Sequence, residues 1–160
     1  MESGKVAVVV GRFQPFHLGH AWLVHQALGQ FEKIIIILGS PNSNSKDNPW
    51  SLSERKEMIE RFLKHEGLEN RVKAIYDVPD VPDDDEWLEL MLKKIGRKKF
   101  VVLGDNEWVN GIFENAGFEV WRVGYFERYK YEGVKIRELI EKGEEWEDRV
   151  PNYLISIIKK

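Results

Sequence analysis

An alternation of apolar strand-like runs with helix-like stretches constrains the fold of this chain more than any other feature. Long apolar runs that are separated by helices are typical of parallel strands buried on both faces. We expect strands at 5–10, 33–38, 71–78, 99–103 and 118–123, and helices at 18–30, 51–66, 86–95, 106–115, 134–142 and 153–160. The sequence therefore predicts a doubly wound, Rossmann-like α/β fold. Its five-stranded parallel sheet carries helices on both faces and is followed by a small helical C-terminal segment.

Length and composition exclude several classes of protein. A chain of 160 residues suffices for one core, so we expect a single domain over residues 1–160. A net charge of −3 argues against a broad nucleic-acid-binding surface. The absence of cysteine excludes disulfides and cysteine-ligated metal. No signal peptide and no apolar run of membrane-spanning length is apparent, so we expect a cytoplasmic protein without nucleic-acid or membrane partners.

The segment Gly11–His20, Gly-Arg-Phe-Gln-Pro-Phe-His-Leu-Gly-His, joins the first expected strand to the first expected helix. A helix N-terminus offers free N–H groups and a partial positive charge, which suit phosphate. His17 and His20 add donors there, and Arg12 adds a fixed charge. A single histidine at such a place is often only a cap. The combination of Arg12, His17, Gly19 and His20 predicts a polyphosphate site, although it matches neither a P-loop nor the dinucleotide fingerprint.

The loops after the first four expected strands should open at the same edge of the sheet, where ligands of such folds bind. In the polar loop 39–48, Lys46 is a candidate for phosphate, unless the loop is simply surface. Trp87 either packs in the core or stacks on a planar base. The turn Gly104-Asp105-Asn106 is either a helix cap or a nucleoside contact, and Arg55 is either a structural residue or a ligand contact.

A second phosphate signal lies near the C-terminus. Arg137 falls in the first turn of an expected helix, where a cation opposes the helix dipole unless an anion binds nearby. Arg128 lies in the basic and aromatic loop that precedes this helix. The acidic run 83–86 is interpreted as a helix cap rather than a metal site.

The segment Gly11–His20 resembles the H-x-G-H signature of the nucleotidylyltransferase superfamily, in the form that archaeal-type nicotinamide mononucleotide (NMN) adenylyltransferases carry. The resemblance spans nearly the whole chain. It continues through residues 38–55, residues 77–87 with Trp87, the turn 104–106 and the segment Tyr131–Arg137.

The resemblance implies direct transfer of the AMP part of ATP to NMN, which gives NAD and pyrophosphate, with Mg²⁺ bound to ATP and no metal site of the protein's own. It also implies a homo-oligomer. Its implied catalytic residues are His17, His20, Arg12 and Arg137. Its implied ATP- and phosphate-binding residues are Gly11, Phe13, Gly19, Lys46, Gly104, Asp105, Arg128 and Gly133, and its implied NMN-binding residues are Gly39, Ser40 and Trp87.

The sequence departs from the family at two positions. Where the family's last motif, Tyr-Ser-Gly-Thr-x-Ile-Arg, has hydroxyl residues, this chain has Glu132 and Val134. Valine donates no hydrogen bond, and glutamate repels phosphate. Two alternatives therefore stay open: a related nucleotidylyltransferase with another phosphate acceptor or with CTP, and a nucleotide-binding regulator with weakened catalysis.

Overall fold

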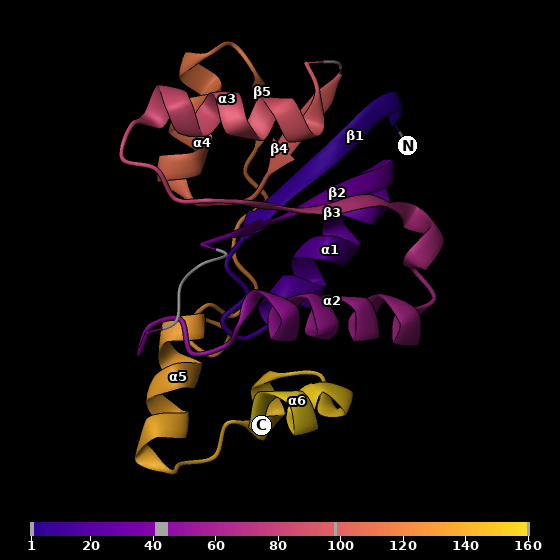
Figure 1. Ribbon diagram of the computed structural model, residues 1–160. Helices are drawn as coiled ribbons and strands as arrows, with labels where there is room; N and C mark the ends of the chain where they lie inside the picture. The colour runs from indigo at the N-terminus through magenta and orange to yellow at the C-terminus, as the bar shows by residue number, and fades with distance from the viewer. Residues whose placement is uncertain (1, 41–44, 98, 160) are drawn as a thin grey trace. The chain divides into compact units, whose positions relative to one another are not determined.

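The computed structural model describes residues 2–40, 45–97 and 99–159 (Figure 1). The chain forms two compact units. Unit 1 comprises Met1–Gly11, Leu23–Pro41 and Asn70–Gly124. Unit 2 comprises Arg12–Trp22, Asn42–Glu69 and Tyr125–Lys160. The expectation of a single domain over residues 1–160 stays a prediction.

Unit 1 is built on a five-stranded parallel sheet with the strand order β3-β2-β1-β4-β5. The chain runs outward from β1 to β3 and then returns to place β4 on the other side of β1. The order therefore switches at β1, the position at which doubly wound folds bind ligands. The strands are β1 (Glu2–Gly11), β2 (Phe31–Gly39), β3 (Val72–Val78), β4 (Phe100–Leu103) and β5 (Glu119–Trp121).

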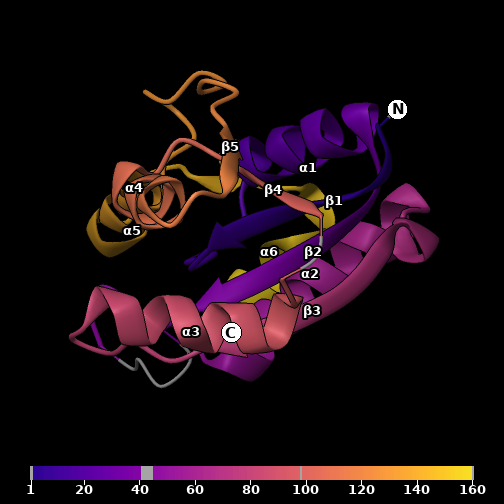
Figure 2. The same ribbon diagram turned by 90° about the horizontal axis from the view of Figure 1, so that it is seen from above.

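Helices cover both faces of this sheet (Figures 1 and 2). On one face, α3 (Asp84–Ile95) and α4 (Glu107–Asn115) contribute Met91 and Phe113 to a core with Val8 and Ile35. On the other face lies α1 (Leu18–Gln30), which from Leu23 onward belongs to unit 1. The central strands β1, β2 and β4 are therefore largely buried, which explains their apolar runs, whereas the edge strands β3 and β5 are more exposed.

Unit 2 consists of helices and the segments that connect them. It contains the first turn of α1 together with α2 (Leu52–Glu66), α5 (Gly133–Lys142) and α6 (Ile155–Lys159). A capping box starts α2, because Ser51 Oγ accepts from the Glu54 N–H and the Glu54 carboxylate accepts from the Ser51 N–H. Phe16 packs on Phe62 of α2, with ring centroids 4.7 Å apart.

The expected elements are confirmed in type and order, and the differences lie at their ends. The two ends of α1 are as expected, whereas β5 is shorter than the expected strand 118–123. The C-terminal helix is also shorter than expected, because a 3₁₀ turn over Asn152–Leu154 precedes α6. Asp83 caps α3, as interpreted from the acidic run.

Among the described residues, no helix is both long and apolar enough to cross a membrane.

Candidate active site

Two stacked histidines stand at the start of α1, and their rings take part in capping it. The Nδ1 atom of His17 accepts the N–H groups of Gly19 at 3.1 Å and His20 at 3.4 Å. The Nδ1 atom of His20 accepts the His17 N–H at 3.1 Å. The two ring centroids lie 3.7 Å apart. The first-turn N–H groups hold these rings in place, so the local helix start orients both imidazoles.

Both histidines are neutral near pH 7. Burial, and secondarily the charge of Arg137, lowers the pKa of His17 from 6.5 to about 3. Burial and the neighbouring His17 lower the pKa of His20 well below its ordinary value. Because Nδ1 of each neutral ring accepts a hydrogen bond, the proton resides on Nε2. Each ring can therefore donate an Nε2–H to an anion.

The depressed pKa of His17 predicts how stability depends on pH. The unfolded chain takes up a proton on this ring below its ordinary pKa of 6.5, whereas the folded chain resists protonation down to about 3. Stability is thus fully present above pH 6.5 and is lost as pH falls toward 3. Protonation of His17 in the unfolded chain should lower the free energy of unfolding by about 1.4 kcal/mol for each pH unit in that window, as measured by urea unfolding.

The matched control for this prediction is His17→Asn, which retains a good helix-capping side chain but does not titrate. Its free energy of unfolding should fall less steeply in the same window. Equal slopes for the variant and the parent would contradict the assignment of a buried, neutral His17.

Gly19 lies where a side chain does not fit. A Cβ at this position would lie 2.9 Å from His17 Cε1, 3.0 Å from His17 Nδ1 and 3.1 Å from Tyr131 Cβ. We therefore expect Gly19→Ala to displace the His17 ring. A displacement of this size should lower kcat by on the order of 10-fold or more and also lower the melting temperature.

The matched control is Gly29→Ala near the end of the same helix, where an added Cβ meets nothing within 4 Å. This control should keep the parental kcat. Parental kinetics in Gly19→Ala would show that the His17 ring tolerates displacement.

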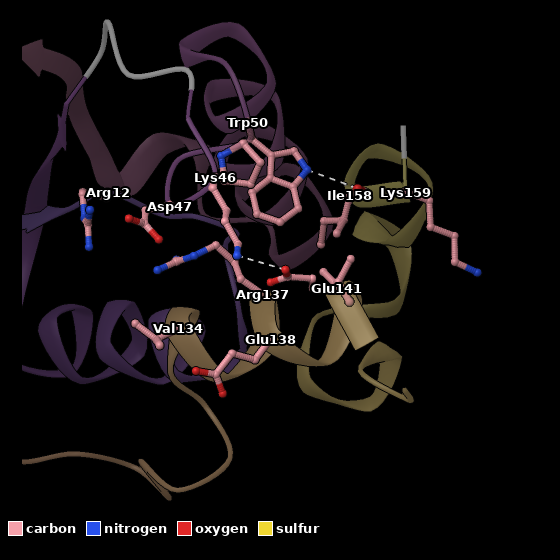
Figure 3. A pocket seen from close by; sticks show the side chains of 12 residues that line it. Arg12, Lys46, Asp47, Trp50, Val134, Arg137, Glu138, Glu141, Ile158 and Lys159 are labelled. Atoms are coloured by element: carbon pink, nitrogen blue, oxygen red, sulfur yellow. Dashed lines mark hydrogen bonds and ion pairs between the residues drawn. The ribbon is translucent and has the colours of Figure 1, made fainter. Parts of the chain in front are cut away.

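A pocket of about 1060 Å³ lies within unit 2 (Figure 3). Arg12, from the loop after β1, and Arg137, from α5, are two of its cationic residues. Figure 3 shows the Arg137 side chain extending from α5 toward Arg12 and Asp47. The other lining residues are Lys46, Asp47, Pro49, Trp50, Val134, Glu138, Ile140, Glu141, Ile158 and Lys159.

The two arginines bring like charges together. Burial, and then the charge of Arg12, lower the pKa of Arg137, which is half-buried. Arg137 Nη1 donates to the Gln14 carbonyl at 2.6 Å, and Arg12 Nη1 donates to Asn48 Oδ1 at 3.4 Å. Two neighbouring guanidinium groups that repel each other favour a bound anion, and their geometry suits phosphate.

Lys46 also lies in the pocket, where it forms an ion pair with Glu141 at 3.0 Å. Both partners are solvent-exposed, so this contact contributes little stability and can be exchanged for a phosphate. Arg55 has a structural role: it is fully buried, and its Nη1 donates to the Arg12 carbonyl at 2.9 Å.

The first turn of α5 carries the departures from the family motif. Glu132 stands at the N-cap position without a side-chain cap, and Arg128 and Lys135 lie 3.8 and 4.0 Å from its carboxylate. Val134 is 46% exposed and lines the pocket. Without a hydroxyl side chain at these positions, α5 offers an anion the backbone N–H groups of its first turn and the side chain of Arg137.

Among the expected site residues, those that belong to unit 1 are Gly11, Gly39, Ser40, Trp87, Gly104 and Asp105. The ends of β1, β2 and β3 lie at one edge of the sheet, since Gly11 pairs with Leu38 and Gly39 with Val78. Ser40 follows β2 with a left-handed φ of 51°.

The turn after β4 has structural hydrogen bonds of its own. The Gly104 carbonyl accepts from Asn110 Nδ2 at 3.0 Å, and the Asp105 carboxylate accepts from the Gly124 N–H at 3.1 Å. Asn106 caps α4.

Trp87 packs in the core of unit 1. It is 4% exposed and contacts Phe113, with ring centroids 6.0 Å apart, and Trp108, with centroids 4.9 Å apart. Trp108 is 50% exposed and is the more accessible indole of the pair. The packing interpretation of Trp87 is confirmed, and stacking on a nicotinamide stays a prediction.

Several residues of the site escaped the sequence analysis, among them Gln14, Asn48 and Glu141. Gln14 had one signal, since it is a polar residue among Phe13, Pro15 and Phe16 in a segment that is buried. Asn48 and Glu141 had none, because their partners are distant in the sequence.

The chain is similar in sequence and in fold to known proteins. A family model described as cytidylyltransferase-like matches residues 8–139. The nicotinamide-nucleotide adenylyltransferase of Ignicoccus hospitalis is 36% identical over 96% of this chain and 91% of its own length. The enzyme of the same name from Archaeoglobus fulgidus is 35% identical over 96% of this chain and 90% of its own length.

Among solved structures, the chain is similar to a bifunctional NMN adenylyltransferase/ADP ribose pyrophosphatase from Francisella tularensis, complexed with AMP and a manganese ion. The TM-score is 0.77 at 24% identity, and the match covers 98% of this chain. The chain spans about half the length of that bifunctional protein, 49%. This likeness shows the shared fold.

Proposed function

This chain belongs to the cytidylyltransferase-like family and, within it, to the nicotinamide-nucleotide adenylyltransferases, and we propose that it joins the AMP part of ATP to NMN. The products are NAD and pyrophosphate, so the chain is an enzyme of NAD biosynthesis. One observation carries the proposal: Arg12 and Arg137 line one pocket, and Arg137 acts electrostatically on the neutral His17. Such a cluster binds and neutralises a polyphosphate.

The reaction proceeds by direct attack without a covalent enzyme intermediate. A 5′-phosphate oxygen of NMN forms a bond to the α-phosphorus of ATP as the bond to the leaving pyrophosphate breaks in line. The enzyme contributes by positioning two anions and by neutralising the charge that develops on the phosphate oxygens. No side chain needs to accept a proton, because the attacking phosphate is already ionised.

In this proposal the cationic and imidazole side chains that hold the triphosphate all belong to unit 2. Nε2–H groups of His17 and His20 donate to oxygens near the transferred group, and Arg12 and Arg137 hold the β and γ oxygens. Lys46 exchanges its contact with Glu141 for a phosphate oxygen. The remaining proposed ATP- and phosphate-binding residues are Gly11, Phe13, Gly19, Gly104, Asp105, Arg128 and Gly133.

NMN recognition is assigned to unit 1. The proposed residues are Gly39 and Ser40 after β2, and Trp87 in α3. The nicotinamide would stack at the indole pair that Trp87 forms with Trp108. Because Trp87 has little exposed surface, this stacking requires the exposed Trp108 ring to shift.

Mg²⁺ is proposed to arrive with ATP. Magnesium in proteins is held by one or two carboxylates together with substrate phosphates. Asp47 and Glu138 line the pocket beside Arg137, so the donor set fits such an ion. The metal would neutralise phosphate charge when bound, while the arginines and histidines orient the chain of phosphates.

The test is pyrophosphate release from Mg²⁺-ATP with and without NMN, with NAD identified by mass spectrometry. NMN-dependent release with NAD as product is expected. Reactions with CTP, and with other phosphorylated acceptors, are the comparison. Release with CTP alone, or with another acceptor and not with NMN, would overturn the proposed substrates.

We further propose a cytoplasmic homo-oligomer, with neither nucleic acid nor membrane as a partner. Light scattering coupled to size exclusion measures the oligomer directly, and a monomeric mass at micromolar concentration would contradict it.

A further inference from the structure

Gln14 is a buried polar residue of the first motif, and it lies in the sequence between Arg12 and His17. It is 2% exposed, and its neighbours Phe13 and Phe16 are also buried. A buried amide is costly unless its donor and acceptor are both used. Gln14 Nε2 donates to the Trp50 carbonyl at 3.0 Å, and Gln14 Oε1 accepts the Trp50 N–H at 3.0 Å. The Gln14 amide thus pairs with both the N–H and the carbonyl of Trp50.

The backbone of Gln14 makes a third connection, to α5. Its carbonyl accepts the Arg137 Nη1 at 2.6 Å. The first turn of α5 lies so close to this carbonyl that a Cβ at Gly133 would be 3.1 Å from the oxygen and 2.9 Å from Arg137 Nη1. Gln14 therefore links the first motif, to which it belongs, with two segments that are distant in the sequence: the segment 45–50 and α5.

Each of these connections ends on a residue of the phosphate pocket. The segment held at Trp50 carries Asn48, whose Oδ1 accepts from Arg12 at 3.4 Å, as well as Lys46. The carbonyl connection fixes the guanidinium of Arg137. Arg12 and Arg137 repel each other, so their separation in the absence of an anion depends on groups such as these.

From these contacts we infer that Gln14 is the positioning residue of the adenylyl-transfer site: it holds Arg12, Lys46 and Arg137 at the spacing that the triphosphate requires. This inference rests on the proposed function. Gln14 acts through these cations and itself touches no reacting atom. A misplacement of about 1 Å in such a site costs on the order of 100-fold in rate.

The sharpest variant is Gln14→Glu, which keeps the shape and the acceptor for the Trp50 N–H. An ionised carboxylate places a second oxygen against the Trp50 carbonyl, whereas the protonated acid can donate to it as the amide does. Burial raises the pKa of such a carboxyl group. We expect kcat/KM for ATP about 100-fold below the parent at alkaline pH, with the ratio to the parent recovering as pH falls.

A merely structural role would not produce this pattern. The KM for NMN should stay within about threefold of the parental value. The decrease in kcat/KM for ATP should come from a lower kcat and a higher KM for ATP. A folded Gln14→Glu enzyme with parental constants at every pH would overturn the inference. So would a pH-independent loss that affects ATP and NMN equally.

Two further variants keep the test decisive. Gln14→Met fills the same volume without hydrogen bonds and replaces Gln14→Glu if that variant does not fold; it should lose activity with no recovery at low pH. Leu63→Ala, in the buried face of α2, lowers the stability of unit 2 without removing a pocket contact. It should keep parental kinetic constants below its melting temperature, and a loss equal to that of the Gln14 variants would overturn the inference.

Failure of the proposed function is distinguishable from failure of this inference. Parental protein that forms no NAD from ATP and NMN would refute the function alone. Calorimetry would then compare the binding of ATP and of AMP to the parent and to Gln14→Glu. We expect at least 10-fold weaker ATP binding and unchanged AMP binding, since AMP lacks the β and γ phosphates. Equal losses for both nucleotides would overturn the inference.

Discussion

Replacement of His20 by alanine should lower kcat by about 100- to 1000-fold while the protein stays folded. The neutral ring has its proton on Nε2, because Nδ1 accepts the His17 N–H at 3.1 Å. In the proposed mechanism, its loss removes a fixed donor to the phosphate oxygens on which charge develops in the transition state. Pyrophosphate release at saturating ATP and NMN measures kcat, and a kcat within about threefold of the parent would contradict the assignment.

Two further variants separate the structural role of Nδ1 from the catalytic role proposed for Nε2. In His20→Asn, the amide can replace the Nδ1 atom that accepts from His17, so the melting temperature should be kept while kcat stays low. In His20→Gln, the longer amide reaches toward the position of Nε2, and part of kcat should return. His25→Ala is the control on the exposed side of the same helix, and it should leave kcat at the parental value.

Replacement of Arg137 by alanine is expected to reduce kcat/KM for ATP by about 100-fold. Arg137 supplies charge to the pocket and at the same time donates to the Gln14 carbonyl at 2.6 Å. Arg137→Lys should recover little, because one ammonium group cannot reproduce a planar guanidinium that serves two acceptors. Initial rates over a range of ATP concentrations, at saturating NMN, check this expectation.

The control for the change in net charge is Lys142→Ala, in the last turn of the same helix and exposed. Its kcat/KM for ATP should stay within about twofold of the parent. A similar loss in both variants would mean that the net charge of the protein, rather than the position of Arg137, determines ATP use. Full activity of Arg137→Lys would show that charge alone is sufficient at this position.

Much of the fold could be predicted because its signals are local. The apolar runs of the strands, the capping residues Ser51 and Asn106 and the Gly-Pro turn before α1 lie within a few residues of the structure they specify. The same holds for the first motif, in which a strand end, a turn and a helix start are consecutive. His17 and His20 are brought together by one helical turn, so their pairing was implicit in their spacing.

The expectation that several loops share one edge also needed little beyond local structure. Parallel strands place their carboxyl ends at the same edge, and Gly39 and Val78 are paired in the sheet as that argument requires. Trp87 shows the limit of this reasoning. Its place in the sequence allowed both packing and stacking, and only the positions of Phe113 and Trp108 around it show that it is buried.

The fold class and the order of the elements therefore follow from the sequence, which also supplies the candidate phosphate-binding residues of each motif. Tertiary structure alone decided how the motifs meet: Arg137 on the Gln14 carbonyl, Gln14 on Trp50, and Lys46 on Glu141. These contacts join residues that are far apart along the chain. Periodicity and capping describe interactions within a few residues, so they carry no information about which distant side chains and backbone groups will become partners.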